Sequence, residues 1–218
     1  MHFACRRFST TIGGVAGDRW QVGGRRCRAQ VGWPATCHLP LALPANTTKN
    51  DNLVIHKTPI DLDTYIRVHG IAAELVYPSD QTPTVTLAAR AMDCAEDQIV
   101  KSVLFLVKHG EQAETIMIMT NGTAQIDFRK LASIFGIGRK RIRLAPTEVV
   151  LAHTGFPAGG VPPFGFDHAI ATFIDRGVFE QGIVYAGGGD DKTLLRTTPA
   201  ELVRVTGARI IDAREESG

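Results

Sequence analysis

The segment from Gly155 to Gly165 constrains the fold more than any other part of this chain. Its eleven residues include four glycines and three prolines. Such a run fits neither a helix nor an inner strand, because proline lacks the N–H and fixes φ. Three apolar side chains also lie in it, which is not the composition of a solvated linker. We expect a rigid, partly buried loop that exposes the main-chain N–H groups of Gly159 and Gly160, although a purely structural crossover loop would have a similar composition.

Charge is distributed unevenly along the 218 residues. Residues 1–50 contain seven basic side chains against the single acid Asp18, although the formal net charge of the whole chain is only +2. This stretch has no hydrophobic periodicity, and we expect residues 1–55 to form a basic, disordered extension before one domain at residues 56–214. Three interpretations of the extension stay open: an organellar transit peptide, an arm that binds nucleic acid, or an upstream stretch without function from a misassigned start codon.

Helices and strands are mixed without a regular alternation. This pattern favours an α+β fold, a single domain built on a curved mixed β-sheet flanked by helices. Start signals, caps and helical spacing predict helices at 61–70, 84–92, 127–136, 147–153 and 198–207. Asp127 caps the third of these, whose expected buried stripe is Phe128, Leu131, Ala132, Ile134 and Phe135, and Thr198, Pro199 and Glu201 fit a capping box. Apolar and β-branched runs predict strands at 73–77, 99–107, 114–120, 141–145, 169–174, 182–185, 193–196 and 209–212.

The sequence lacks the motifs of several common types of catalytic and metal-binding site. The three cysteines before residue 50 are irregularly spaced, and Cys94 reads as a packed thiol rather than a nucleophile. The zinc motifs HxxxH, CxxC and HExxH are absent, as are the GxSxG elbow and the phosphate-binding loop GxxxxGK[ST]. No apolar run approaches the roughly 20 residues that cross a bilayer. We therefore expect no metal, no cofactor and no membrane association.

Four segments together resemble a known family. They are Ile99 to Leu104, Arg141 to Ala145, the loop Gly159-Gly160-Val161-Pro162-Pro163-Phe164-Gly165, and Thr198 to Leu202. Their order and spacing, over about residues 60–213, are similar to those of the YbaK and prolyl-tRNA synthetase editing-domain family, which hydrolyses mischarged aminoacyl-tRNA. The loop fits the Gly-Gly-x-x-Pro-x-Gly form of its free-standing members. The resemblance implies the same α+β fold.

Lys101 interrupts an apolar predicted strand, where a buried charge needs a partner. Judged on the sequence alone, a strand-end lysine that reaches solvent is the commoner case. The resemblance instead implies that Lys101 reaches the active site and contacts the 3′-terminal nucleotide. It also implies a neighbouring hydroxyl, here Ser102, and a site tyrosine at about Tyr77. An amphipathic tyrosine at the edge of the core would explain Tyr77 equally well.

The resemblance assigns the loop a role at the reacting ester. Gly159 and Gly160 would stabilise the oxyanion through main-chain donors, worth about 3–4 kcal/mol for a well-placed donor. Together with Lys101 they form the predicted catalytic set. The predicted substrate-binding set adds side chains and glycines around them: Tyr77, Ser102, Val161, Pro162, Pro163, Gly187 and Asp190.

Asp190 and Asp191 follow a triple-glycine turn at residues 187–189 and could act as general bases. A turn role explains them as well. Here the chain departs from the family pattern, because Leu194 stands about where some members carry an acidic residue. Ala186 or Gly187 stands where they carry a small hydroxyl residue. His153 and His168 flank the loop without metal-ligand spacing.

A local concentration of basic residues at 129–143 favours contact with phosphates, although a solvated helix and turn would look similar. Its members are Arg129, Lys130, Arg139, Lys140, Arg141 and Arg143.

The function expected from the resemblance is trans-editing: hydrolysis of mischarged aminoacyl-tRNA, in particular Ala- or Cys-tRNA(Pro). Its partners would be the tRNA acceptor end and prolyl-tRNA synthetase, in the cytoplasm unless the basic N-terminus directs the protein to an organelle. A non-catalytic module that binds tRNA or a synthetase on the same scaffold is the alternative. Hydrolysis of another small ester or amide is a third possibility.

Overall fold

A computed structural model describes residues 56–79, 82, 84–109 and 112–215, together with the backbone of two short paired strands, β1 (Gln21–Val22) and β2 (Arg25–Arg26). Apart from these two strands, the predicted extension at residues 1–55 lies outside the described residues. No helix within the described residues is long and apolar enough to cross a membrane.

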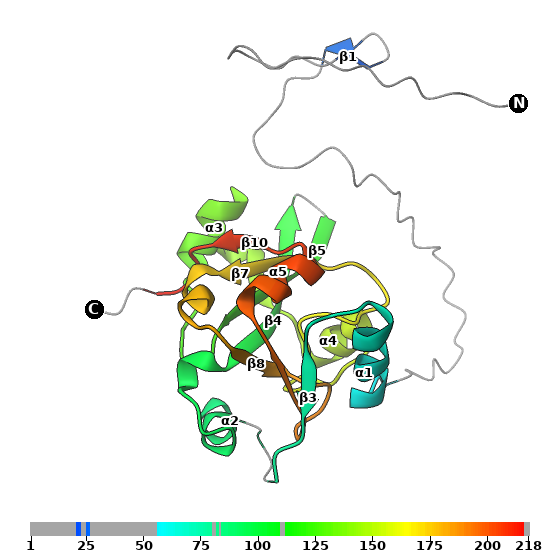
Figure 1. The fold of residues 1–218 in the computed structure, drawn as a ribbon. Helices are drawn as coiled ribbons and strands as arrows, with labels where there is room; N and C mark the ends of the chain where they lie inside the picture. Colours follow the sequence, from blue (N-terminus) through cyan, green and yellow to red (C-terminus); the bar gives the residue numbers. More distant parts are fainter. Residues whose placement is uncertain are drawn as a thin grey trace, which may run out of the picture. The chain divides into compact units, whose positions relative to one another are not determined.

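A five-stranded mixed sheet forms the centre of the domain (Figure 1). Its strand order is β10-β7-β5-β4-β6. The predicted hairpin is confirmed, since β4 pairs antiparallel with β5 and His109 lies opposite Gln112. Strands β7 and β10 extend the sheet in parallel beyond β5, and β6 pairs antiparallel with the other side of β4. The strands are β4 (Val100–His109), β5 (Gln112–Asn121), β6 (Ile142–Leu144), β7 (Ala171–Asp175) and β10 (Arg209–Ile211).

A separate three-stranded antiparallel sheet has the order β3-β9-β8. It consists of β3 (Glu74–Val76), β8 (Val184–Gly187) and β9 (Leu194–Thr197). The two sheets meet at a single parallel bridge between Ile99 and Tyr185. The α+β class is confirmed, but the single curved sheet resolves into two, because sheet membership depends on pairing between residues far apart in the sequence.

Five α-helices lie within 1–2 residues of the predicted starts, and their caps explain why. Thr84, Asp127 and Thr198 accept hydrogen bonds from main-chain N–H groups in the first turns of α2, α3 and α5. Gly136 and Gly207 end α3 and α5 in the left-handed conformation. The helices are α1 (Pro59–Val68), α2 (Val85–Ala91), α3 (Phe128–Phe135), α4 (Thr147–Thr154) and α5 (Pro199–Thr206). Three short 3₁₀ turns were not predicted: η1 (Glu96–Gln98), η2 (Arg139–Arg141) and η3 (Arg176–Glu180).

Two details of the helices differ from the sequence-based expectation. The expected capping box of α5 is half formed, because the Glu201 carboxylate turns away from the cap and accepts the Ala72 main-chain N–H at 2.6 Å. Hydrogen bonds from Arg204 and then from Ala72 lower the pKa of Glu201 to about 2. In α3, Ile134 is 40% exposed, whereas the buried stripe follows Leu131 and its partly buried neighbours.

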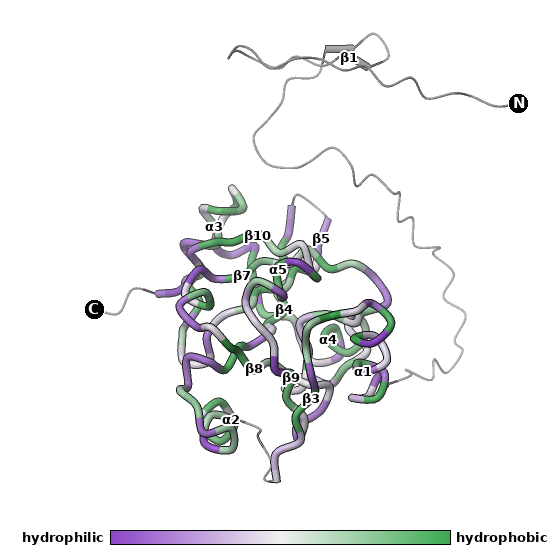
Figure 2. The backbone as a smooth tube through the Cα atoms, viewed as in Figure 1, coloured by the Kyte–Doolittle hydropathy of each residue, from purple (hydrophilic) through white to green (hydrophobic). Residues whose placement is uncertain are grey.

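Apolar side chains fill both faces of the five-stranded sheet. On one face, Met119 and Ile174 belong to a core shared with α1, α5 and the three-stranded sheet. On the other face, Phe105 and Phe173 pack with Leu131 of α3. Figure 2 shows green and purple alternating along α1, α2 and α3, as expected for helices that bury one side only.

Candidate functional site

A cavity of about 360 Å³ opens beside β4 where its neighbouring strands diverge. Strand β6 pairs with β4 only at residues 105–107, and the Ala145 N–H donates to the Leu104 carbonyl at 2.9 Å. Strand β8 forms a β-bridge with the segment before β4 at Ile99. The stretch of β4 between these contacts keeps an open edge. Because alternate residues turn their peptide groups to the same edge of a strand, the Ser102 N–H and carbonyl face this opening.

The cavity wall is mostly apolar, with few polar side chains. It brings together the start of α2, the start of β9, residues of β4 and the segment from Gly155 to Gly165, called the Gly/Pro loop below. Its polar side chains come from Thr82, Thr84, Lys101 and Ser102. An apolar pocket with few convergent polar groups is typical of a small-molecule site. The apolar lining includes Val85, Ala88, Ile99, Leu144, Val150, Val161 and Leu194.

Ser102 places an unsatisfied hydroxyl at this wall. Its Oγ is buried and has no hydrogen-bond partner among the described residues. Buried polar atoms are almost always hydrogen-bonded. A hydroxyl left unpaired at a cavity wall therefore marks a position where a polar atom of a ligand would be accepted.

Lys101 also lines the cavity and is exposed. It forms no ion pair or hydrogen bond with a side chain that the structure describes. Opposite it in β5 lies Thr120, an uncharged residue. The ammonium group is therefore available to an anionic ligand, which is the condition that the predicted role of Lys101 requires.

The Gly/Pro loop is partly buried, as predicted. Residues 157–159 are exposed, whereas residues 160–165 are buried. Gly159 lines the cavity, and its N–H has no partner among the described residues. Gly160 differs from the expectation, because its N–H donates to the Pro157 carbonyl at 3.1 Å and is not presented as a free donor.

Gly160 and Gly187 allow two loops to approach closely. The Gly189 N–H donates to the Gly160 carbonyl at 2.9 Å. A Cβ on Gly160 would lie 2.7 Å from three main-chain atoms of Asp190, and a Cβ on Gly187 would collide with the Val161 carbonyl. Because neither glycine has a side chain, the Gly/Pro loop and the turn at residues 187–190 can pack directly against each other. Gly187 also lines the cavity.

Lys57, which precedes α1, fastens both ends of the Gly/Pro loop. Its main-chain N–H donates to the Gly155 carbonyl at 2.8 Å. Its Nζ donates to the Gly165 carbonyl at 2.7 Å and forms an ion pair with Asp167 at 2.7 Å. Lys57 and the loop are about 100 residues apart in the sequence. No local sequence pattern could therefore have indicated these contacts.

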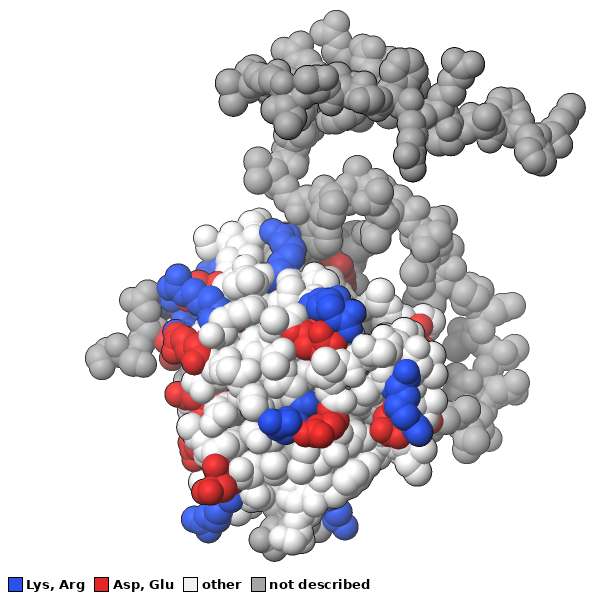
Figure 3. Space-filling model, viewed as in Figure 1, with Lys and Arg blue, Asp and Glu red and all other residues white. Residues whose placement is uncertain are grey.

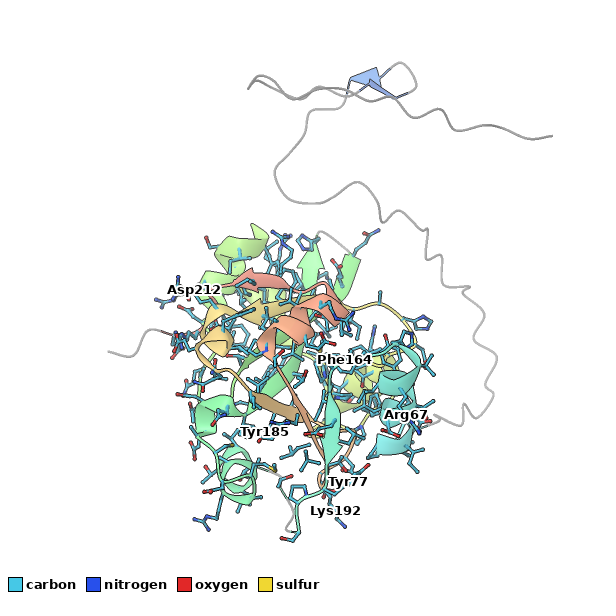
Figure 4. The ribbon with its side chains drawn as sticks, in the orientation of Figure 1. Arg67, Tyr77, Phe164, Tyr185, Lys192 and Asp212 are labelled. Atoms are coloured by element: carbon cyan, nitrogen blue, oxygen red, sulfur yellow. The ribbon has the colours of Figure 1, made fainter. Side chains whose placement is uncertain are left out.

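Of the predicted site residues, five line the cavity and five do not. The lining residues are Lys101, Ser102, Gly159, Val161 and Gly187. Gly160, Pro162 and Pro163 are buried in the loop behind this wall. Tyr77 is 64% exposed and lies at the margin of the molecule, beyond the end of β3 (Figure 4). Asp190 is the fifth residue outside the wall.

The two aspartates hold the glycine turn. The Asp190 carboxylate accepts the Lys192 main-chain N–H at 2.9 Å, and the Asp191 carbonyl accepts the Thr82 N–H at 3.1 Å. These contacts match the turn interpretation of both residues. Their predicted part in catalysis or substrate binding gains no geometric support.

Sequence reasoning missed the wall that α2 contributes. Helical spacing predicts a helix at 84–92, but nothing in the sequence indicates that Thr84 and Ala88 line this cavity. Cys94 lies half-buried beside this helix. Burial and then Asp93 raise the pKa of its thiol, which suits a packed residue better than a nucleophile. No group of three potential metal ligands occurs among the described residues.

We expect Ser102→Ala to lower activity at this site about tenfold without lowering stability. Removing a buried, unpaired hydroxyl relieves a desolvation penalty of about 1 kcal/mol, whereas a lost hydrogen bond to a ligand costs a similar amount. Thr120→Val is the matched control, because the Thr120 Oγ1 is also buried and unpaired but does not line the cavity. Melting temperature and turnover, measured on both variants, test this. Equal activities of the two variants would contradict a ligand contact at Ser102.

Comparisons with known proteins point to one family. The model of the aminoacyl-tRNA editing domain matches residues 79–205. The uncharacterized protein YwhH of Bacillus subtilis is 34% identical over 119 residues, which cover 55% of this chain and 72% of that protein. Proline–tRNA ligase of Limosilactobacillus fermentum is 28% identical over 111 residues, half of this chain but only 19% of the ligase.

Solved structures show the same fold. A candidate trans-editing enzyme for prolyl-tRNA synthetase superposes with a TM-score of 0.66 at 30% identity, covering 72% of this chain and 97% of that chain. A hypothetical protein superposes with a TM-score of 0.64, also at 30% identity, covering 71% of this chain and 99% of that chain.

Proposed function

This chain belongs to the aminoacyl-tRNA editing domain family, and from that premise we propose that it hydrolyses mischarged aminoacyl-tRNA. We place the reaction in the cavity beside β4, whose wall carries Lys101, Ser102 and Gly159. The unpaired, buried Ser102 hydroxyl is the observation that carries the proposal, because buried polar atoms are almost always hydrogen-bonded and a polar atom of a ligand would supply the partner that the described residues do not.

The proposed reaction is a simple ester hydrolysis. The oxygen of a water molecule bonds to the ester carbonyl carbon, the bond from that carbon to the ribose oxygen breaks, and the ribose oxygen takes a proton. Negative charge develops on the carbonyl oxygen during the attack. Main-chain donors stabilise such charge well, and two are available at the cavity: the Gly159 N–H and the Ser102 N–H.

Lys101 would hold the terminal nucleotide through a phosphate. The activating base would belong to the substrate, either a ribose hydroxyl or a thiol of the amino acid, because the described cavity wall carries no carboxylate or imidazole. The loop that Lys57 fastens would keep the donors in place before the substrate arrives.

For the substrate we propose Ala- or Cys-tRNA(Pro), cleaved in trans for a prolyl-tRNA synthetase partner. One solved neighbour is described as a candidate trans-editing enzyme for that synthetase. The apolar wall suits a small aliphatic or thiol side chain. A pocket of this kind separates substrates by size, at about 1–3 kcal/mol per methylene group.

One observation favours the alternative of a non-catalytic module that binds tRNA or a synthetase. It is the same lack of a carboxylate or imidazole among the described residues of the cavity wall. A binding module would associate with tRNA stoichiometrically and show no turnover.

Release of labelled amino acid from Ala-, Cys- and Pro-charged tRNA(Pro) tests the proposal. We expect rapid loss from the Ala or the Cys form while Pro-tRNA(Pro) is spared. Loss from none of the three, with intact tRNA binding, would contradict the hydrolase and support the binding module. Equal loss from all three would contradict the proposed specificity.

A further inference from the structure

A second groove, of about 220 Å³, lies beside β4 and β6 and is rich in basic side chains. Lys108 comes from β4, Lys140 and Arg141 from η2, and Arg143 from β6. All four are exposed. Lys108 was not part of the basic concentration predicted from the sequence, and the pairing of β4 with β6 brings it there.

These four cations lack acidic partners. None of them forms an ion pair with a carboxylate that the structure describes. Two other residues of the predicted concentration are already engaged: Lys130 pairs with Asp212 at 3.2 Å, and Arg139 lies over the Phe128 ring at 5.6 Å.

The charges over α1, β3 and α5 contrast with this groove. On the face shown in Figure 3, blue and red side chains lie in adjacent pairs, as expected from the ion pairs of those elements. Like charges gathered without counterions repel one another and attract an anionic ligand. Among the described residues, the groove thus gathers four basic side chains that no ion pair neutralises.

The groove and the cavity lie in succession along the same two strands. Residues 99–104 of β4 and its lead-in, with Leu144 and Ala145, line the cavity, whereas residues 106–108 and Arg143 line the groove. With a rise of about 3.3 Å per residue, Ser102 and Val107 are roughly 16–17 Å apart along β4. A polynucleotide whose 3′ end occupies the cavity could therefore place phosphates further from that end over the groove.

We propose that Lys108, Lys140, Arg141 and Arg143 bind phosphates of the tRNA acceptor stem while its 3′ end lies in the cavity. The inference rests on the proposed function for the identity of the RNA. Arginine guanidinium groups and lysine ammonium groups are the usual partners of nucleic-acid phosphates. The groove would contact the RNA backbone rather than the bases. It would therefore contribute affinity and orientation of the tRNA, but not selectivity for the attached amino acid.

The test compares two triple variants of the full chain. Lys140→Gln, Arg141→Gln and Arg143→Gln together remove three of the groove's four positive charges. The matched control removes three exposed arginines elsewhere on the surface: Arg67, Arg90 and Arg209, each replaced by Gln. Both variants lose three positive charges, one set from the groove and the other from elsewhere on the surface. Binding of uncharged tRNA(Pro) is measured at several salt concentrations, with melting temperature as the check of folding.

We expect the groove variant to bind tRNA about tenfold to hundredfold more weakly and to lose about 2–3 units of slope in log K against log salt, because each phosphate contact contributes about 0.9. Its KM for charged tRNA should rise while kcat stays unchanged. Hydrolysis of an aminoacyl-adenosine, which carries no phosphate for the groove to bind, should not change. If the triple variant does not fold, Arg143→Gln alone should lower the slope by about 1.

The inference is wrong if the groove variant keeps the tRNA affinity and the salt slope of the wild type. It is also wrong if both triple variants lose equal tRNA affinity. Unchanged tRNA affinity with lost binding to anionic phospholipid vesicles would also overturn it and assign the groove to a lipid surface. The proposed function fails separately: if the wild-type chain releases no amino acid from any charged tRNA yet binds tRNA through the groove, the inference stands without the hydrolase.

Discussion

Lys101→Met is expected to reduce deacylation of the mischarged tRNA about hundredfold, because losing the phosphate contact lets the ester shift and a misplacement of about 1 Å can cost that much. Methionine keeps the aliphatic stem of the lysine and suits a strand. Lys101 is exposed and has no ion-pair partner among the described residues, so the melting temperature should stay close to that of the wild type. Single-turnover release of labelled amino acid measures the effect.

Two further variants sharpen this test. Lys101→Arg keeps the positive charge and should recover part of the activity if the residue holds a phosphate. Lys192→Ala removes an exposed lysine from the turn after Asp190 but keeps the N–H that the Asp190 carboxylate accepts, so it should leave deacylation unchanged. Wild-type turnover of Lys101→Met would show that the assigned role is wrong.

Gly160→Ala is expected to destabilise the fold by about 2–3 kcal/mol, which lowers the melting temperature by roughly 5–10 °C in a chain of this size. The added Cβ would lie 2.7 Å from the N, Cα and O of Asp190. Main-chain atoms cannot turn aside as a flexible side chain can. The two loops must therefore separate, and activity in the cavity should fall as well. Thermal unfolding and deacylation of the same preparation measure both effects.

The control for this substitution is Gly182→Ala. Gly182 has open space around its missing Cβ and no positive φ. Its replacement should leave stability unchanged or raise it by about 0.4–1 kcal/mol, because alanine restricts the unfolded chain. A Gly160→Ala variant that melts like Gly182→Ala would contradict the close approach of the two loops.

Local patterns predicted the elements of this domain well. Asp127 and Thr198 begin their helices where the capping rule places them, and Gly136 ends α3 in the left-handed conformation. The hairpin of β4 and β5 also follows from local residues. These features depend on neighbours within a few positions, which is why propensity and spacing were sufficient. The exposed Ile134 shows the limit of such patterns, because the helix surface that is buried depends on what packs against it.

The candidate site was predicted in part. Resemblance of motifs pointed to Lys101, Ser102, Gly159, Val161 and Gly187, and all five line one cavity. Their predicted roles stay proposals. Tyr77, by contrast, is 64% exposed and does not line the cavity.

The sequence by itself determined the α+β class, the helix caps, the glycine- and proline-rich loop and the family resemblance, because each depends on residue types and short spacings. Only the tertiary structure decided that there are two sheets, that β4 keeps an open edge between them, and that the Gly160 N–H is already used. It also decided that Lys57 fastens the loop and that Lys108 joins the basic groove. The reason is physical: each of these features depends on a contact between segments that are distant along the chain. Such contacts cannot be predicted from the residue types of a short segment.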